Sequence, residues 1–374
     1  MVRRPRLTEH AMWVTRWDYK TREDCRAIAE NCKAIGVDTI LFQVRGNATA
    51  FYRSSLEPWA EQFGFKDPGF DPLAVMIEET RSRGMRLVAW VNVVPAWYGP
   101  VPPTDPNHVY NKHPEWMWYD QNGKRQGLSE KFYVSLNPCL PEVRAHIVSV
   151  IGEIAARYPI DGVHLDYSRF PNEAPATPAG SGLDYPRDAQ TLKLFAAATK
   201  KTPDQDPAAW DRWRTNQVTE LVRQIRAKVR AVKPDIELSS AVGVKRESAL
   251  HHHQDAYTWL SEDLIDTVYP MNYTGDSKVF ASRCDTWKQA MPGERIVMGI
   301  MFDKGNADVL RTQVQRALDQ CNGFAIFAYS SLFPSPNDAV DRPDPAQRAQ
   351  RDALGKALSG WLRDLKPAAN NTQR

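Results

Sequence analysis

The sequence predicts an α/β fold: a single (β/α)8 TIM barrel with long loops at the C-terminal face. Short apolar runs alternate with helical stretches along most of the 374 residues, and eight strand candidates can be counted. No Gly-x-Gly-x-x-Gly or Walker loop follows the first strand. A doubly wound open sheet is the alternative, but eight strand–helix units favour a closed barrel. We expect one catalytic domain over residues 1–374, with its core at about 11–365.

The elements follow one another in strand–helix order. Helix stops at Gly36 and Pro234, and a helix start at Pro141 and Glu142, support the boundaries. The predicted strands are 12–17, 39–45, 87–94, 162–167, 236–242, 267–273, 295–300 and 324–329. The predicted helices include 22–35, 72–83, 141–157, 209–232 and 346–365.

The composition argues against several classes of protein. Lys and Arg number 48 and Asp and Glu 45, the formal charge is +3, and no basic block occurs, so we expect no nucleic-acid partner. No apolar stretch is long enough for a membrane span, and no protein partner is evident. The basic start lacks the apolar region of a signal peptide. Localisation stays open: exported or periplasmic if a signal peptide was removed, otherwise cytoplasmic.

Metal and cofactor binding are not expected. The five cysteines lack CxxC spacing. Three consecutive histidines at 251–253 lack the spacing of metal ligands, and a solvated loop or helix start suits them better.

Polar side chains gather at the predicted strand ends, where barrels of this kind place their active sites. Because strand side chains alternate between faces, Asp166 shares a face with His164, and Trp90 shares one with Asn92. Arg45 ends the second strand. Together these residues predict a polar, aromatic-walled mouth above an apolar wall.

Asp166 is the sharpest catalytic candidate, because a carboxylate ending an apolar strand must be solvated, paired or functional. Its structural alternative is an ion pair with Arg169 or Arg45. His164 is either a proton shuttle or a hydrogen-bonded core residue. Arg45, Arg169 and Arg214 either hold sugar hydroxyls or a substrate carboxylate, or pair with Asp166 and its neighbours.

An aromatic-rich segment follows the third strand. Flat rings with polar edges suit sugars, so the segment predicts a carbohydrate polymer or oligosaccharide as the ligand. About half of the rings are expected to form the loop's own small core. They are Trp97, Tyr98, Tyr110, Trp116, Trp118, Tyr119 and Tyr133.

Several of these segments resemble glycosyl hydrolase-like family ten, a bacterial group of lipoproteins and hydrolases of peptidoglycan glycan strands. The most specific is 158–171, which reads Tyr-Pro-Ile-Asp-Gly-Val-His-Leu-Asp-Tyr-Ser-Arg-Phe-Pro. Segments 213–217 and 259–273, Arg45-Gly46 and 90–92 support it by order and spacing, so the likeness spans roughly 11–330.

The resemblance implies a (β/α)8 barrel and hydrolysis of glycosidic bonds in a polysaccharide, such as peptidoglycan or another amino-sugar polymer. It implies that Asp166 is a catalytic carboxylate. It also brings forward Arg169, Arg214, Asn216, Asn272 and Tyr273 as site residues. With the strand-end residues Arg45, Trp90, Asn92, His164 and Tyr167, these are the residues expected to bind substrate.

A fainter likeness to chitinase-type barrels breaks down at one position. That pattern places an acid glutamate two residues after its last aspartate, and this chain has Ser168 there. Most glycosidases use two carboxyl groups. Asp276, Glu247 and Asp303 follow later strands, and we predict Asp276 as the second acid. An acetamido group of the substrate is the alternative nucleophile.

Three other functions compete with a glycosidase. A catalytically inactive carbohydrate-binding barrel would explain the missing second acid. A metal-dependent hydrolase and a structural interaction domain are the others, and the sequence offers neither metal spacing nor a partner-binding stripe.

Overall fold

A closed parallel barrel forms the centre of the molecule. The computed structural model describes residues 8–171, 182–336, 338 and 344–365. The strands run around the barrel as β1, β2, β3, β6, β7, β8, β9 and β10, and β10 pairs back onto β1. They are β1 (Glu9–Val14), β2 (Thr39–Arg45), β3 (Arg86–Asn92), β6 (Gly162–Asp166), β7 (Glu237–Gly243), β8 (Thr267–Met271), β9 (Met298–Met301) and β10 (Gly323–Phe327). The predicted (β/α)8 barrel is confirmed.

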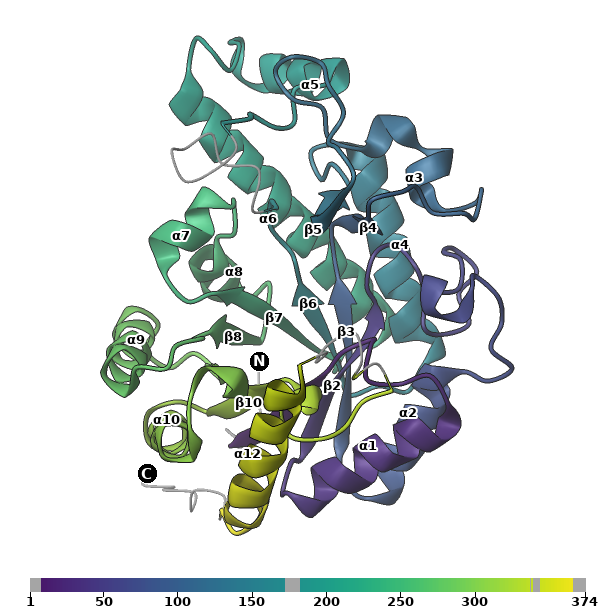
Figure 1. The fold of residues 1–374 in the computed structure, drawn as a ribbon. Helices are drawn as coiled ribbons and strands as arrows, with labels where there is room; N and C mark the ends of the chain where they lie inside the picture. The colour runs from purple at the N-terminus through teal and green to yellow at the C-terminus, as the bar shows by residue number, and fades with distance from the viewer. Residues whose placement is uncertain (1–7, 172–181, 337, 339–343, 366–374) are drawn as a thin grey trace.

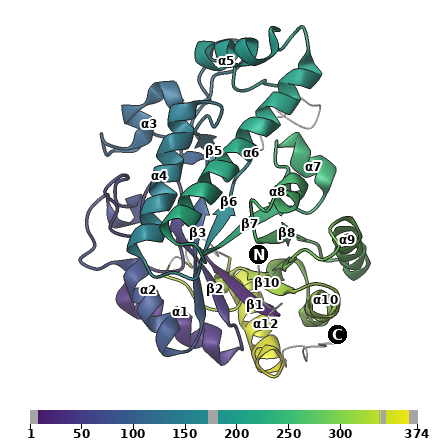
Figure 2. The same cartoon turned by 180° about the vertical axis from the view of Figure 1, so that it is seen from behind.

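Helices surround the barrel, and the long helices α4 and α6 lie side by side on its outside (Figures 1 and 2). None of the helices in the described part of the chain is long and apolar enough to cross a membrane. The helices are α1 (Arg22–Ala34), α2 (Pro72–Ser82), α3 (Val109–Lys112), α4 (Pro141–Arg157), α5 (Ala189–Thr199), α6 (Pro207–Val232), α7 (Arg246–His251), α8 (Ala256–Ser261), α9 (Ser277–Ala290), α10 (Ala307–Gln320) and α12 (Pro345–Arg363).

Side-chain caps fix where the principal helices begin. Thr21 and Asp24 form a reciprocal capping box at the start of α1. Asp71 accepts from Ala74 N at the start of α2, and α6 begins with Asp206 followed by Pro207. The capped start of α6 at Pro207 lies two residues before the predicted start at 209.

Ion pairs close the amino-terminal end of the barrel. Arg86 bonds Glu9 at 3.3 Å and Glu237 at 2.5 Å, and Arg295 bonds Glu9 at 2.5 Å. Glu9 is only 2% exposed. This network corrects the first predicted strand, which starts at Glu9 rather than at Met12, because a paired glutamate is tolerated inside the barrel.

A two-stranded sheet lies over the carboxyl end of the barrel (Figure 1). It is formed by β4 (Pro95–Gly99) and β5 (Ser129–Ser135), which the sequence analysis treated as part of a loop. The rings of Trp97, Tyr110 and Trp118 are buried beneath it. The expectation that part of the aromatic segment forms its own core is therefore correct, and of the remaining rings those of Tyr98 and Tyr133 line a hollow at the barrel mouth.

Candidate active site

Asp166 and Asn92 lie next to each other at the barrel mouth. They are the last residues of the neighbouring strands β6 and β3 and are partners in the strand register. Two residues earlier on the same strands, Trp90 is the register partner of His164. Because alternate residues share a face, the fold places these four predicted site residues together on the inner surface.

The carboxyl group of Asp166 is buried at 7% exposure. Its Oδ1 accepts from the backbone N–H of Tyr167 at 2.7 Å. Burial raises the pKa of Asp166 above its ordinary value, and Arg169, the Tyr167 N–H and the indole of Trp90 offset only part of that rise. Asp166 is thus a carboxyl group that retains its proton to higher pH than an exposed aspartic acid.

Asn92 and Trp90 offer unused hydrogen-bonding groups beside Asp166. Asn92 is 1% exposed, and neither its Nδ2 nor its Oδ1 has a partner among the described residues. Trp90 Nε1 lies near enough to lower the pKa of Asp166 but makes no hydrogen bond of normal geometry there. Buried polar groups are normally paired, so these atoms are suited to a ligand.

Tyr167 turns the chain sharply as it leaves β6. Its φ of 50° lies in the left-handed region, which is costly for a residue with a large side chain. The turn sets its ring 5.1 Å from that of Tyr133, and the guanidinium of Arg169 lies 4.6 Å from the Tyr167 ring. Tyr167 and Arg169 thus form one wall of the mouth.

His164 serves the barrel interior. Trp13 Nε1 donates to its Nε2 at 3.2 Å, so the proton is on Nδ1, which lies 2.9 Å from Ser239 Oγ. Burial lowers the pKa of His164 to about 3. The ring is therefore neutral, and both of its nitrogens have hydrogen-bond partners within the protein. This arrangement fits a hydrogen-bonded core residue better than a proton shuttle or a substrate ligand.

Arg45 is held in a buried ion pair with Glu57. Its Nε and Nη2 bond the two carboxylate oxygens, each at 2.7 Å, and its Nη1 donates to the carbonyl oxygens of Asn92 and Val93. Burial raises the pKa of Glu57, but Arg45 and His146 outweigh it and bring the pKa to about 2. Arg45 therefore fixes the end of β3 instead of pairing with Asp166.

Three further predicted residues make no described contact with Asp166. Arg214 bonds Asp184 and the Tyr185 carbonyl at 2.6 Å each, which anchors the segment before α5 to α6. Asn216 is exposed on α6. The Asn272 amide donates to Phe280 O and accepts from Arg283. The polar groups of Arg214 and Asn272 bond other parts of the protein, and the side chain of Asn216 faces solvent.

The two residues predicted after β8 have different surroundings. Tyr273 packs 5.5 Å from the Phe327 ring, and burial together with the charge of Asp166 raises its pKa well above the ordinary value. Tyr273 therefore belongs to the neighbourhood of Asp166. Asp276 caps α9, accepting from Lys278 N and Val279 N. No described contact joins Asp276 to Asp166, so its catalytic role stays a prediction.

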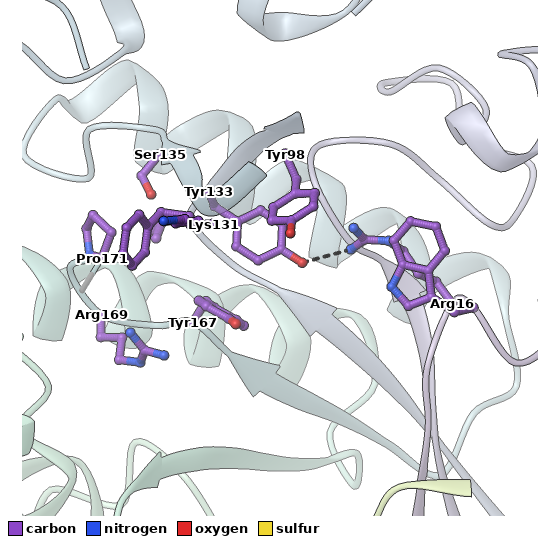
Figure 3. Close-up of a pocket in the computed structure, with 11 residues that line it drawn as sticks. Arg16, Tyr98, Lys131, Tyr133, Ser135, Tyr167, Arg169 and Pro171 are labelled. Carbon is purple, nitrogen blue, oxygen red and sulfur yellow. Dashed lines mark hydrogen bonds between the residues drawn. The ribbon is translucent and has the colours of Figure 1, made fainter. Parts of the chain in front are cut away.

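A hollow of about 510 Å³ opens above β1, β3 and β6 (Figure 3). It is lined by Arg16, Trp17, Val94, Tyr98, Lys131, Phe132, Tyr133, Ser135, Tyr167, Arg169 and Pro171. Tyr98 and Phe132 are each 37% exposed and offer ring faces to this hollow. The sequence analysis missed Arg16, Lys131 and Phe132, although Arg16 follows a strand end by two residues.

A second hollow of about 450 Å³ lies on the other side of Trp17. It is lined by Thr15, Trp17, Asp303, Phe327, Ala328, Ser330, Gln347, Gln350, Arg351 and Leu354. Trp17 is the residue that lines both hollows.

Metal ligation is not evident at this mouth. Within residues 8–171, 182–336, 338 and 344–365, no three His, Cys, Asp or Glu side chains are grouped to hold an ion. His253 is 6% exposed and lies 3.0 Å from Thr215 Oγ1 through its Nδ1. The solvated setting predicted for the histidine triplet is thus wrong for His253, which packs against Phe170.

The sequence matches a known family over most of its length. The sequence model of the family described as glycosyl hydrolase-like 10 matches residues 10–307. The chain is 27% identical over 309 residues to glycosyl hydrolase DigH of Escherichia coli K12, which covers 74% of this chain and 64% of DigH. It is 29% identical over 267 residues to glycosyl hydrolase YngK of Bacillus subtilis 168, covering 66% and 48%. The chain spans less than two thirds of either relative.

Solved structures share the barrel. The PgaB glycoside hydrolase domain from Bordetella bronchiseptica aligns with a TM-score of 0.65 at 14% identity, covering 92% of this chain and 98% of that domain. The catalytic domain of a Paenibacillus polymyxa β-amylase aligns with a TM-score of 0.63 at 11% identity, covering 93% and 98%. At such identities the likeness establishes the fold alone.

Proposed function

The chain belongs to the glycosyl hydrolase-like 10 family, and from that premise we propose that it hydrolyses glycosidic bonds in an amino-sugar polysaccharide, with Asp166 as the general acid/base. The observation that carries the proposal is the raised pKa of Asp166 at the carboxyl end of β6, beside the unpaired amide of Asn92. A carboxyl group that retains its proton is suited to protonate a leaving oxygen.

In the proposed reaction Asp166 first donates a proton and later takes one up. Asp166 donates it to the glycosidic oxygen as the bond to the anomeric carbon breaks. Asp166, now a carboxylate, then takes a proton from the water that attacks the anomeric carbon, which restores the starting state. The N–H groups of Asn92 and Trp90 lie beside Asp166 without partners among the described residues, which supports a role for them in binding the sugar hydroxyls or the acetamido group.

The second participant of the reaction is either a protein carboxylate or the acetamido oxygen of the substrate. Asp276 is capping α9 in the described state, whereas an acetamido group next to the anomeric carbon brings its own nucleophile. We favour the acetamido route, and with it an amino-sugar polymer such as peptidoglycan glycan strands. The exposed rings of Tyr98 and Phe132 support a polysaccharide by offering stacking faces.

A product screen tests this proposal. Wild type, Asp166→Asn and Asp276→Asn are incubated with chitin-type chains, peptide-stripped peptidoglycan and neutral polysaccharides, and products are identified by mass spectrometry. Products from wild type and Asp276→Asn, but not from Asp166→Asn, support Asp166 with an acetamido nucleophile. Loss of cleavage products in both variants would support Asp276 as the second catalytic acid. Binding without cleavage by wild type supports the inactive carbohydrate-binding barrel instead.

A further inference from the structure

Arg16 lies between β1 and α1 and forms part of the wall of the hollow over Asp166's strand (Figure 3). It is only 1% exposed, although its guanidinium carries a charge. Burial lowers the pKa of Arg16, but Tyr133 and Glu61 raise it by more, so its pKa stays above the ordinary value. Arg16 is therefore a buried cation at the mouth.

The guanidinium of Arg16 has polar and aromatic neighbours but no ion-pair partner in the described part of the chain. Its Nη1 donates to Tyr133 Oη at 3.2 Å, and its Nε has no hydrogen-bond partner. The ring centres of Trp17 and Tyr133 lie 4.6 and 5.7 Å from its Cζ. Glu61 instead bonds Asn47 and Thr49. Aromatic faces and the more distant charge of Glu61 thus stabilise the Arg16 cation without a direct ion pair, which leaves it able to pair with the carboxylate of a ligand.

The chain leaves space for this guanidinium at Gly46. A Cβ atom at Gly46 would lie 2.0 Å from Arg16 Nη1 and 2.6 Å from its Cζ. A side chain at position 46 would therefore require Arg16 to move. The glycine that follows β2 thus leaves room for the guanidinium where it lines the hollow.

Two more cations line the same hollow. Figure 3 shows Arg16 and Arg169 at opposite ends, with the rings of Tyr133 and Tyr167 between them and Lys131 close by. Three basic side chains around stacking rings form a positively charged sugar-binding surface. A guanidinium with free N–H groups binds a carboxylate through forked hydrogen bonds.

We infer that this hollow is a subsite for a carboxylate-bearing sugar, and that Arg16 is the specificity-determining counter-ion of that carboxylate. The inference rests on the proposed glycosidase function and adds the charge of the substrate to it. The carboxylate belongs either to a uronic acid or to an ether-linked lactate on an amino sugar. Neutral chains fit the rings but leave Arg16 without a partner.

Substrate chemistry tests this without altering the protein. Wild type is assayed on peptide-free peptidoglycan glycan strands, on the same strands with carboxylates reduced to hydroxymethyl groups, and on chitohexaose. We expect KM to rise at least 10-fold on reduction, with kcat changed much less. Equal KM for native and reduced strands overturns the inference. Hyaluronan oligosaccharides separate the two carboxylates: tight binding there indicates a uronic acid, and weak binding indicates the lactyl ether.

Variants then assign the effect to Arg16. Arg16→Met should lose the preference for native over reduced strands, and Arg16→Lys should restore part of it. Arg26→Met removes the same charge from an exposed site on α1 and should keep the preference. If Arg16→Met fails to fold, Lys131→Met at the rim should show a smaller loss. A wild-type preference retained by folded Arg16→Met would overturn the assignment.

Calorimetric binding to Asp166→Asn separates this inference from the proposed function. Preferential binding of carboxylated strands without any cleavage by wild type would support the anion subsite and contradict the glycosidase. Cleavage of native and reduced strands at equal KM would support the glycosidase and contradict the anion subsite.

Discussion

Asn92 and Asp166 end the neighbouring strands β3 and β6 as register partners, one carrying an unpaired amide and the other a carboxyl group whose pKa is raised by burial. Both features oppose stability. An unpaired buried amide and a buried carboxyl group each cost free energy that a purely structural barrel has no reason to retain. Their position at the mouth is the reason for interpreting them as a site.

Asn92 and Asn272 form a matched pair that tests this interpretation. Asn92→Ala removes no hydrogen bond within the described chain, so the free energy of unfolding should change by less than about 1 kcal/mol while kcat/KM falls roughly 10- to 1000-fold. Asn272→Ala breaks bonds to Phe280 and Arg283 and should cost about 1–3 kcal/mol. Chemical denaturation and hydrolysis rates distinguish them. Equal destabilisation by both would contradict the functional role of Asn92.

The pH dependence of hydrolysis should show the proton on Asp166. If the protonated form is the general acid, kcat/KM falls as pH rises through the raised pKa of Asp166. A profile of rate against pH measures this limb. Its midpoint should lie above 3.8, the ordinary value for aspartate. A rate that rises through this range would indicate that the ionised form acts instead.

Asp166→Asn should stabilise the protein at neutral pH. The folded pKa is raised, so the buried carboxyl group costs nothing below the unfolded pKa of 3.8 and costs progressively more as pH rises above it. The asparagine keeps the acceptor for Tyr167 N and removes that cost. We expect a higher Tm, by roughly 2 °C or more, at pH 7 and no gain below pH 3.8, by thermal unfolding. A lower Tm at pH 7 would show that Asp166 is stabilising.

Acid should destabilise the barrel through His164. The pKa of His164 in the folded protein is about 3, below the ordinary 6.5. The stability that the neutral ring contributes is therefore complete above pH 6.5 and is lost as the pH falls towards 3. His164→Asn replaces the Nδ1–H donor without a titrating ring. Its free energy of unfolding should fall less than that of wild type between pH 6.5 and 3, as measured by urea titration. Parallel curves would contradict a neutral buried imidazole.

Arg45 and Glu57 should prove structural. Arg45→Met leaves the buried carboxylate of Glu57 with His146 alone and should cost roughly 3–5 kcal/mol, while Arg45→Met combined with Glu57→Leu should cost less. Urea unfolding of the two singles and the double completes a mutant cycle. If Arg45→Met is as stable as wild type but binds substrate less tightly, Arg45 is a substrate-binding residue and not a structural one.

The fold was largely predictable from the sequence, because strand and helix periodicities and helix caps are local signals. The predicted Thr39–Arg45 strand and Pro141–Arg157 helix agree with β2 and α4. The start of β1 was not predictable, because Glu9 is stabilised inside the barrel by Arg86 and Arg295, which are distant in sequence.

The site was predictable only in part. Alternation along β3 and β6 brings Trp90, Asn92 and Asp166 together, as predicted. Arg45 and Arg214 look the same in sequence as Arg16, and only tertiary contacts show which arginines are already paired. The position of Tyr133 over Arg16 depends on the pairing of β4 with β5, which are far apart in the sequence and have no local signal strong enough to reveal that pairing.

The central claim, that Asp166 protonates the leaving group, is tested most directly by comparing leaving groups in Asp166→Asn. Rates are measured on the glycan that wild type cleaves and on the dinitrophenyl glycoside of the same sugar, whose leaving group needs no proton. We predict at least a roughly 100-fold loss on the glycan and a much smaller loss on the dinitrophenyl glycoside. Equal losses on both substrates, or no loss on either, would contradict Asp166 as the general acid.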